Sequence, residues 1–287
     1  MARQRLGQHF LDDLDWREQI ARAIRVSAQS LVPSSAPHDS NRASPYCWIE
    51  IGAGHGEMTA HLAATGAPVC AIELDASLAQ RLRHLTQQFP NLTVVPGDVL
   101  RADIAAIAAG RRVHIYGNLP YYITSPILHR LFEFAELIDE MHIVIQTEVA
   151  ERLTAQPRSK SYGYLSVITQ LYARPELVLR IPREAFRPPP EVGSALVTLR
   201  FPGQRAELGL SDEAQFLDFV KLCFAQKRKT LVNNLRSLAT PDRLRGALEH
   251  LGLRPDARAE QLGLPLLAAL SRELPSQSGK TYRRDVP

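Results

Sequence analysis

Short apolar runs recur through the first two thirds of the chain, and turn-forming or polar residues bound each of them. Such runs are typical of buried strands, and helical crossovers are the usual connections between parallel strands. The pattern therefore predicts a doubly wound α/β fold whose first five strands are parallel. The expected strands span residues 46–51, 69–73, 92–96, 112–116, 141–146, 177–179 and 195–199.

Beyond about residue 203 the apolar spacing becomes helical. After a helix-start signal at 211–213, large apolar side chains recur three or four positions apart, and later segments alternate helical patterns with Gly and Pro. The sequence predicts an α/β domain over residues 1–202 and a small all-helical domain over 203–287, with a loose tail after 275. The apolar positions of the first expected helix are Phe216, Phe219, Val220 and Phe224.

The net charge of +4 is distributed unevenly along the 287 residues. Residues 203–287 carry 14 Lys or Arg against 10 Asp or Glu, whereas residues 1–202 carry 20 against 20. The excess therefore lies in the C-terminal third, where nucleic-acid phosphates would bind. Lys227, Arg228 and Lys229 are the candidate RNA contacts, although a basic cluster also forms on helix faces that are simply solvated.

Other bulk features favour a cytoplasmic enzyme without a metal site. The cysteines Cys47, Cys70 and Cys223 are too few and too widely spaced for a disulfide framework or a zinc site, so we expect buried small hydrophobes. No histidine pair has metal-ligand spacing, and no apolar run suggests a signal peptide or a membrane span.

A glycine-rich run at residues 49–59 (IEIGAGHGEMT) follows the first expected strand. Its glycines, Gly52, Gly54 and Gly56, would let the backbone turn tightly beneath a ligand where a helix begins. The spacing is G-x-G-x-G with an acid, Glu50, two residues earlier, which differs from the G-x-G-x-x-G of dinucleotide binders. The run indicates a nucleotide-type site other than an NAD site, although alone it is a weak signal.

Carboxylates follow the next two expected strands. Glu73 lies 21 residues after Gly52, where a carboxylate can accept from both hydroxyls of a ribose. Asp98 follows the third strand, within reach of an adenine amino group. Each of these acids could instead be a solvated carboxylate or a helix cap, but their order at successive strand ends favours a shared crevice.

The hexapeptide at residues 117–122 (GNLPYY) follows the fourth expected strand and suits an amino group on a flat base. The Asn118 amide oxygen and the Leu119 carbonyl are two acceptors for the two hydrogens of an exocyclic amine, and Pro120 biases Leu119 toward an extended conformation. Tyr121 offers a ring on which a base can stack. The alternative is an ordinary turn in which Asn and Pro are only turn formers.

Together these motifs resemble those of the ribosomal RNA adenine N6-dimethyltransferases. The early matching segments are 7–11 (GQHFL), 50–54, 73–75, 97–98 and 118–121. Later segments resemble the bacterial small-subunit branch, whose absence confers kasugamycin resistance: 146–153, 161–167, 186–192 and 224–231. The resemblance covers residues from about 5 to 268. It implies a Rossmann-like fold, S-adenosylmethionine as methyl donor, and two adjacent adenosines near the 3′ end of 16S rRNA as substrate.

The resemblance also assigns roles to residues. It implies that the last two strands are antiparallel and that the small ribosomal subunit precursor is the partner. It also implies that Phe186, in a stiff loop at 183–190, closes on the target base opposite Tyr121, with a phenylalanine of the core as the alternative. We expect a monomer. The implied cofactor contacts are His9, Leu11, Gly52, Gly54, Glu73, Asp98 and Asn118, and the implied catalytic residues are Asn118, Leu119, Pro120, Tyr121 and Phe186.

Two features depart from the family pattern. His9 stands where the family usually has Asn, beside the methionine portion of the cofactor. A neutral imidazole offers one donor and one acceptor, roughly as an amide does, so binding is expected to survive. A polar stretch at residues 32–45 is longer than the family usually places before the first strand, and we expect a solvated loop there.

Other classes of protein share part of this pattern. An RNA-binding assembly factor without activity would explain the basic C-terminal third, but intact Asn118, Glu73 and Asp98 count against it. A large-subunit rRNA adenine methyltransferase that confers macrolide resistance shares the early motifs, whereas segments 161–167 and 224–231 favour the small-subunit enzyme. A methyltransferase for proteins or small molecules is the most distant alternative.

Overall fold

The computed structural model describes residues 9–26 and 44–274. Gly7 and Gln8 of the N-terminal motif, the expected loop at 32–45 up to Ala43, and the tail after 275 lie outside the described residues. The chain divides into two compact units. The first comprises Met1–Thr154 and Tyr172–Pro202, and the second comprises Ala155–Leu171 and Gly203–Pro287.

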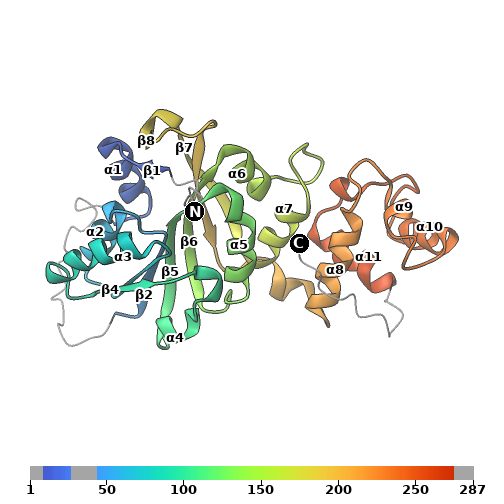
Figure 1. The fold of residues 1–287 in the computed structure, drawn as a ribbon. Helices are drawn as coiled ribbons and strands as arrows, with labels where there is room; N and C mark the ends of the chain where they lie inside the picture. Colours follow the sequence, from blue (N-terminus) through green and yellow to red (C-terminus); the bar gives the residue numbers. More distant parts are fainter. Residues whose placement is uncertain (1–8, 27–43, 275–287) are drawn as a thin grey trace, which may run out of the picture. The chain divides into compact units, whose positions relative to one another are not determined.

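A seven-stranded sheet with the order β4-β3-β2-β5-β6-β9-β7 forms the centre of the first unit (Figure 1). The strands from β4 to β6 are parallel, and β9 is antiparallel to both β6 and β7. The structure confirms the doubly wound α/β class, the expected strands and the antiparallel last pair. The bounds are β2 Tyr46–Ile51, β3 Val69–Glu73, β4 Leu92–Pro96, β5 Arg112–Asn118, β6 Ile138–Gln146, β7 Arg174–Ile181 and β9 Ser194–Arg200.

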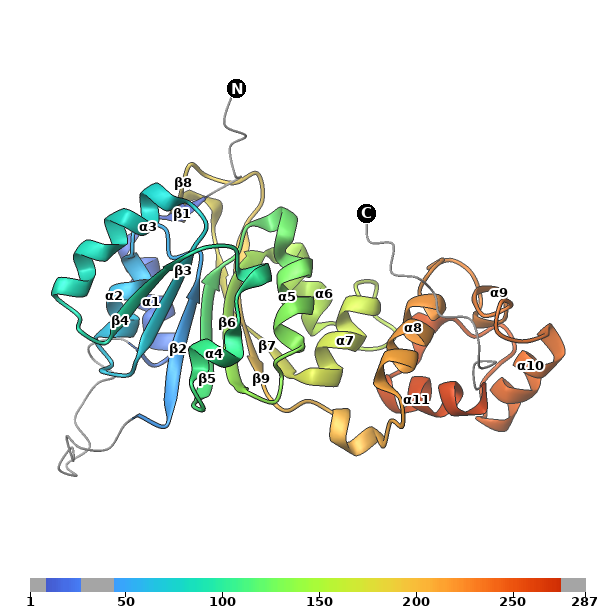
Figure 2. The same ribbon diagram turned by 60° about the horizontal axis from the view of Figure 1, so that its bottom comes forward.

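Helices cover both faces of this sheet. In Figures 1 and 2, α1, α2 and α3 lie on one side of the strands, and α4 and α5 lie on the other. The α-helices of this unit are α1 Leu14–Ala23, α2 Glu57–Ala63, α3 Ala76–Leu82, α4 Ile104–Ala108, α5 Thr124–Phe132 and α6 Thr147–Thr154. The 3₁₀ helices are η1 Arg83–Gln87, η2 Val99–Arg101, η3 Tyr121–Ile123 and η4 Arg183–Ala185.

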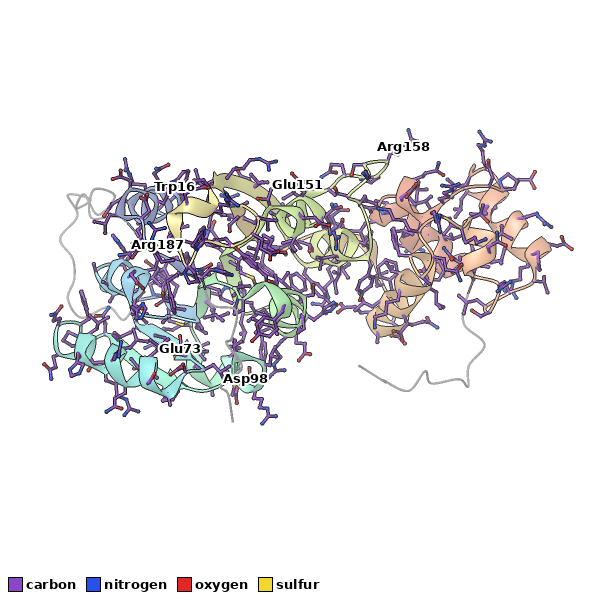
Figure 3. The ribbon with its side chains drawn as sticks, turned by 45° about the horizontal axis from the view of Figure 1, so that its top comes forward. Trp16, Glu73, Asp98, Glu151, Arg158 and Arg187 are labelled. Carbon is purple, nitrogen blue, oxygen red and sulfur yellow. The ribbon has the colours of Figure 1, made fainter. Side chains whose placement is uncertain are left out.

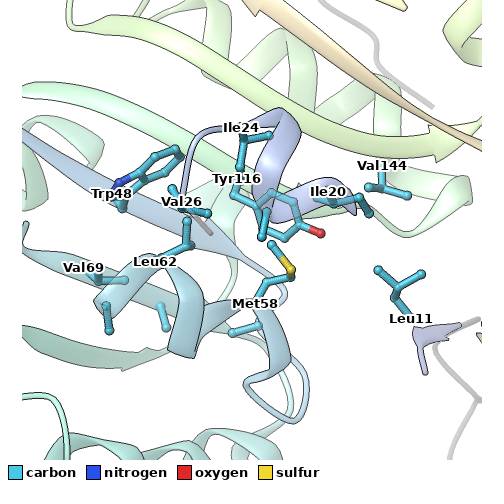
Figure 4. Close-up of a cluster of buried hydrophobic side chains, with 14 of the residues drawn as sticks. Leu11, Ile20, Ile24, Val26, Trp48, Met58, Leu62, Val69, Tyr116 and Val144 are labelled. Atoms are coloured by element: carbon cyan, nitrogen blue, oxygen red, sulfur yellow. The ribbon is translucent and has the colours of Figure 1, made fainter. Parts of the chain in front are cut away.

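A buried cluster joins α1 and α2 to the sheet (Figure 4). Ile20 and Leu62 come from the helices, and Trp48, Tyr116 and Val144 come from β2, β5 and β6. Burying each such side chain stabilises the fold by about 1.5–3 kcal/mol. Because α2 begins at the glycine turn, this packing also fixes the turn against the sheet.

A small second sheet adds the N-terminal segment to the same cluster. Strand β1, Phe10–Leu11, pairs antiparallel with β8, Phe186–Arg187, and places Leu11 opposite Phe186. Leu11 is 6% exposed and Phe186 is fully buried. Two segments far apart in sequence therefore close one end of the core.

The second unit is helical, as the apolar spacing predicts. The side chain of Asp212 accepts from the backbone N–H of Gln215 and caps α8, and Thr230 caps α9. Its helices are α8 Glu213–Cys223, α9 Leu231–Asn234, α10 Pro241–His250 and α11 Leu264–Glu273, with 3₁₀ helices η5 Arg205–Leu208 and η6 Ala259–Gln261. Helix α7, Tyr164–Tyr172, ends at the boundary between the units.

The structure departs from the expected division at residues 155–171, which pack with the second unit. The ring of Tyr162 lies 6.0 Å from that of Phe224, and the Arg158 N–H donates to the Glu260 carbonyl at 2.7 Å. With these boundaries the second unit carries 16 Lys or Arg against 10 Asp or Glu, and the first carries 18 against 20. The basic charge is therefore more concentrated than the linear division indicated.

The three cysteines are buried and unpaired, as the sequence predicts. Burial raises the pKa of the Cys70 thiol to about 11, which is typical of an unreactive core cysteine. Among the described residues, no helix combines the length and apolar character needed to cross a membrane.

The buried position of Phe186 gives a first prediction. Phe186→Ala should lower the free energy of unfolding by about 3–5 kcal/mol, because it empties a filled site in the core. Urea unfolding measures this change, and Tyr122→Ala is the matched control because the Tyr122 side chain is exposed. A loss below about 1 kcal/mol for Phe186→Ala would contradict the packing described here.

Candidate functional site

The glycine turn joins β2 to α2 at the carboxyl edge of the parallel sheet. Gly52, Gly54 and Gly56 have φ values of +68°, +59° and +91°, which glycine adopts without the steric cost of a side chain. A Cβ at Gly56 would lie 2.6 Å from Leu85 Cδ1. Among the described residues, a Cβ at Gly52 would make an ordinary van der Waals contact with the Asn118 carbonyl, at 3.9 Å, so this glycine is not needed to avoid a clash.

Glu73 ends β3 and binds the glycine turn. Its Oε2 accepts from the Gly54 N–H at 2.8 Å, and its Oε1 accepts from the Asp75 N–H at 2.9 Å. The side chain is almost fully buried. The sequence predicts a ribose contact but not this backbone role, and a ribose would have to use the remaining lone pairs of the carboxylate.

Asp98 lies at the same edge of the sheet as Glu73 (Figure 3). Parallel pairing sets Glu73 opposite Pro96, and Asp98 follows two residues later. Asp98 Oδ1 accepts from the Leu100 N–H at 2.9 Å and caps η2. Asp98 therefore acts as a helix cap through Oδ1, as the alternative prediction had it. Its second oxygen, which no described residue binds, suits a ligand.

Glu50 is a buried carboxyl group on β2, two residues before the glycine turn. Thr59 Oγ1 donates to its Oε2 at 2.5 Å. Burial raises the pKa of Glu50 to about 8, and the negative charges of Glu57 and Glu73 add to this effect. Glu50 is therefore predominantly protonated at neutral pH, a state that its position in the motif did not reveal.

Asn118 is the last residue of β5 and lies beside the glycine turn. Its Nδ2 donates to the His9 carbonyl at 2.9 Å. Because a carbonyl can only accept, this contact fixes which end of the amide carries the hydrogens. Asn118 Oδ1 is then available as an acceptor, because no donor among the described residues binds it.

The backbone after Asn118 is held on both sides of the Leu119 carbonyl. The Leu119 N–H donates to the Val144 carbonyl at 3.0 Å, and the Pro120 carbonyl accepts from the Ile123 N–H at 3.2 Å. Within residues 9–26 and 44–274, no donor occupies the Leu119 carbonyl. Leu119 is only 1% exposed, however, so a base can reach this oxygen only after a local opening.

Tyr121 is partly exposed and anchored at its hydroxyl. The hydroxyl is 2.7 Å from the Ser194 Oγ, and Ser194 is fully buried in β9. Burial raises the pKa of the Tyr121 phenol. The role of Ser194 went unrecognised in the sequence because 73 residues separate the two side chains.

His9 and Phe10 lie across the site. The Phe10 ring is 4.4 Å from the His55 ring. A Cβ at Gly54 would lie 3.0 Å from Cε1 of the Phe10 ring. The His9 ring lies 5.7 Å from the Tyr121 ring at an angle of 25°. The N-terminal segment thus connects the glycine turn, through Phe10, to the end of β5, through His9.

Two residues with roles assigned from the resemblance lie in the core in the described conformation. Leu11 and Phe186 face each other in the β1–β8 pair and belong to the buried cluster, with 6% and 0% of their surface exposed. The burial of both side chains results from antiparallel pairing between distant segments, which local sequence patterns do not predict. We assign both side chains to the core.

The basic cluster of the second unit lies on a turn. Lys227, Arg228 and Lys229 are exposed between α8 and α9, not on a helix face. Lys227 Nζ donates to the Lys160 carbonyl. The exposed Lys160, in segment 155–171, is therefore next to the basic turn.

The sheet order, the antiparallel β9, and a glycine turn followed by acids at successive strand ends define a Rossmann-like methyltransferase. The family model described as ribosomal RNA adenine dimethylase matches residues 1–274, and the chain belongs to this family.

Two curated relatives have the name ribosomal RNA small subunit methyltransferase A. The protein from Acidobacterium capsulatum is 44% identical over 232 residues, 80% of this chain and 82% of the relative. The protein from Koribacter versatilis is 37% identical over 283 residues, 94% of this chain and 93% of the relative.

Solved structures share the fold. A dimethyladenosine transferase from Plasmodium falciparum is 23% identical with a TM-score of 0.73, and the match covers 92% of this chain and 97% of that one. The 23S rRNA methyltransferase ErmE is 26% identical with a TM-score of 0.64, and the match covers 92% and 99% of the two chains.

The buried carboxyl of Glu50 makes stability depend on pH. Its pKa is raised from 4.5 to about 8 in the fold, so the folded state holds this proton while the unfolded state releases it. The free energy of unfolding should therefore fall between about pH 4.5 and about pH 8, and Glu50→Gln should remove this part of the decline.

Urea unfolding of both proteins at about pH 5 and about pH 9 measures the effect, on the order of a few kcal/mol. Glu191→Gln is the control, since Glu191 is exposed. An unchanged pH dependence in Glu50→Gln would contradict the protonated state.

Proposed function

We propose that the protein transfers methyl groups from S-adenosylmethionine to N6 of two adjacent adenosines near the 3′ end of 16S rRNA. The observation that carries this proposal is the orientation of the Asn118 amide, whose oxygen is left as an uncharged acceptor beside the glycine turn. Family membership and the small-subunit names of the curated relatives support the same reaction.

The residues present fit the proposed methyl donor. The glycine turn lies next to Asn118 at the edge of the sheet, where a ligand would contact both, and the second oxygen of Asp98, which no described residue binds, suits an adenine amino group. Glu73 holds the turn through Gly54 and keeps lone pairs for ribose hydroxyls. When bound, S-adenosylmethionine supplies an electrophilic methyl group on a sulfonium.

The amine of adenine is a weak nucleophile because its lone pair is delocalised into the ring. Asn118 Oδ1 and the Leu119 carbonyl would accept its two hydrogens and turn the lone pair toward the methyl group. Orientation is the main catalytic contribution. The nitrogen–carbon bond forms as the sulfur–carbon bond breaks, and the proton then leaves to water, so a strong general base is unnecessary.

The target base must leave its stack, at a cost of a few kcal/mol. Stacking on Tyr121 offsets about 1–3 kcal/mol of this cost. Because Leu119 is only 1% exposed in the described conformation, the base can reach its carbonyl only after a local opening. We place the reaction in the cytoplasm, on a small ribosomal subunit precursor, with the enzyme as a monomer and Lys227–Lys229 on rRNA phosphates.

Two single substitutions, Asn118→Ala and Glu73→Ala, should distinguish the residues needed for methyl transfer from those needed for cofactor binding. Asn118→Ala should abolish methyl transfer with little change in cofactor affinity, because the amide acts on the base. Glu73→Ala should weaken cofactor binding strongly, because the glycine turn loses the acceptor for the Gly54 N–H. Calorimetric titration with S-adenosylmethionine and a radiolabelled methyl-transfer assay on rRNA measure the two effects.

Each of these variants serves as the control for the other. Lost cofactor binding in Asn118→Ala, or full affinity in Glu73→Ala, would contradict the assigned roles. Cofactor binding by the wild type without transfer to rRNA would support the alternative of an inactive assembly factor.

Charge reversal tests the basic turn. Changing Lys227, Arg228 and Lys229 to Glu should weaken rRNA binding by more than about tenfold and flatten its salt dependence, because each phosphate contact contributes about 0.7–0.9 to the log–log slope. The unfolding free energy should change little, since exposed charges contribute little to folding. Filter binding at several salt concentrations measures both quantities.

The matched control reverses three exposed arginines of the first unit, Arg22, Arg81 and Arg83, and so changes the net charge equally. We expect a much smaller loss of affinity in this control. Equal losses in the two triple variants would show a general charge effect and would argue against docking through the basic turn.

A further inference from the structure

The side chain of His9 makes two contacts that lead away from the cofactor crevice. Its Nδ1 lies 2.7 Å from the carbonyl oxygen of Pro188, in the loop that follows β8. Its ring lies alongside the ring of Tyr121, with centroids 5.7 Å apart. The same residue's backbone carbonyl accepts from Asn118 Nδ2. His9 therefore contacts the Pro188 loop and two residues of the proposed base site, Tyr121 and Asn118.

The chemistry of the Pro188 contact fixes the imidazole. A carbonyl oxygen only accepts hydrogen bonds, so Nδ1 must carry a hydrogen. This condition is met by the neutral tautomer protonated at Nδ1 and by the imidazolium. In both states the ring is tied to the Pro188 loop, and the ring plane is held near that of Tyr121.

We infer that His9 is a positioning residue for the target adenine. Its ring fastens residues 9–11 to the Pro188 loop and to Tyr121, and this places the His9 carbonyl against the Asn118 amide. The amide is then locked with Oδ1 toward the base. This inference rests on the proposed function and adds a determinant that acts through Asn118, apart from the cofactor contact that the resemblance implies for this position.

Neighbouring contacts support a fixed placement of the segment. Arg17 Nε donates to the Leu11 carbonyl at 2.7 Å, and the N–H groups of Asp12 and Asp13 donate to the Ala185 carbonyl at 2.9 and 3.2 Å. These bonds hold the backbone that follows His9. The His9 ring supplies the corresponding attachment at the start of the segment, next to Asn118.

Three substitutions separate the ring from its hydrogen bond. His9→Ala removes both contacts, and His9→Phe keeps a ring beside Tyr121 without the Nδ1 donor. In His9→Asn, the side-chain Nδ2 occupies nearly the position of the imidazole Nδ1 and restores the donor to Pro188. All three retain the backbone carbonyl, so each effect reports how the side chain places it.

The first measurement is steady-state methyl transfer to rRNA. At saturating S-adenosylmethionine, we expect kcat to fall about fivefold to tenfold in His9→Ala and His9→Phe, the range for one lost hydrogen bond. His9→Asn should recover to within about twofold of the wild type. Unchanged kcat in His9→Ala, no recovery in His9→Asn, or a loss confined to cofactor affinity would overturn the inference.

The second measurement does not depend on activity. In protein labelled with ¹⁵N-asparagine, the side-chain NH₂ resonances of Asn118, identified by their absence in Asn118→Ala, should shift in His9→Ala and His9→Phe but not in His9→Asn. Unshifted resonances in His9→Ala would overturn the positioning role even if the enzyme is active. A wild type without transfer activity would instead contradict the proposed function.

Discussion

The parallel pairing of β2 with both β3 and β5 is the constraint on which the site depends. Ile51 lies opposite Ile72 on one side and Gly117 on the other, so the three strands end at one edge of the sheet. This register brings the glycine turn, Glu73 and Asn118 together from distant parts of the chain. A shift of one residue in either pairing would turn these side chains to the opposite face.

Within this arrangement the side chains around the glycine turn are held in fixed orientations and carry little net charge. Glu50 is held protonated by burial, and both oxygens of Glu73 accept from backbone N–H groups. The Asn118 amide is uncharged and is held by the His9 carbonyl. The net positive charge is concentrated in the other unit, which carries 16 basic against 10 acidic residues.

Local patterns in the sequence were enough to predict the sheet and the residues at its edge. Apolar runs located every strand of the large sheet, and the order of Gly52, Glu73, Asp98 and Asn118 indicated one crevice. Contacts between distant segments could not be predicted in this way. The burial of Phe186 against Leu11, the bond between Tyr121 and Ser194, and the packing of residues 155–171 with the helical unit all depend on tertiary pairing.

The central claim is that the end of β5 directs methyl transfer to adenine N6. The most direct test is mass spectrometry of 16S rRNA after incubation with the protein and isotopically labelled S-adenosylmethionine. The account predicts labelled N6,N6-dimethyladenosine at two adjacent positions near the 3′ end. Unmodified rRNA, or label on any other base or atom, would contradict it.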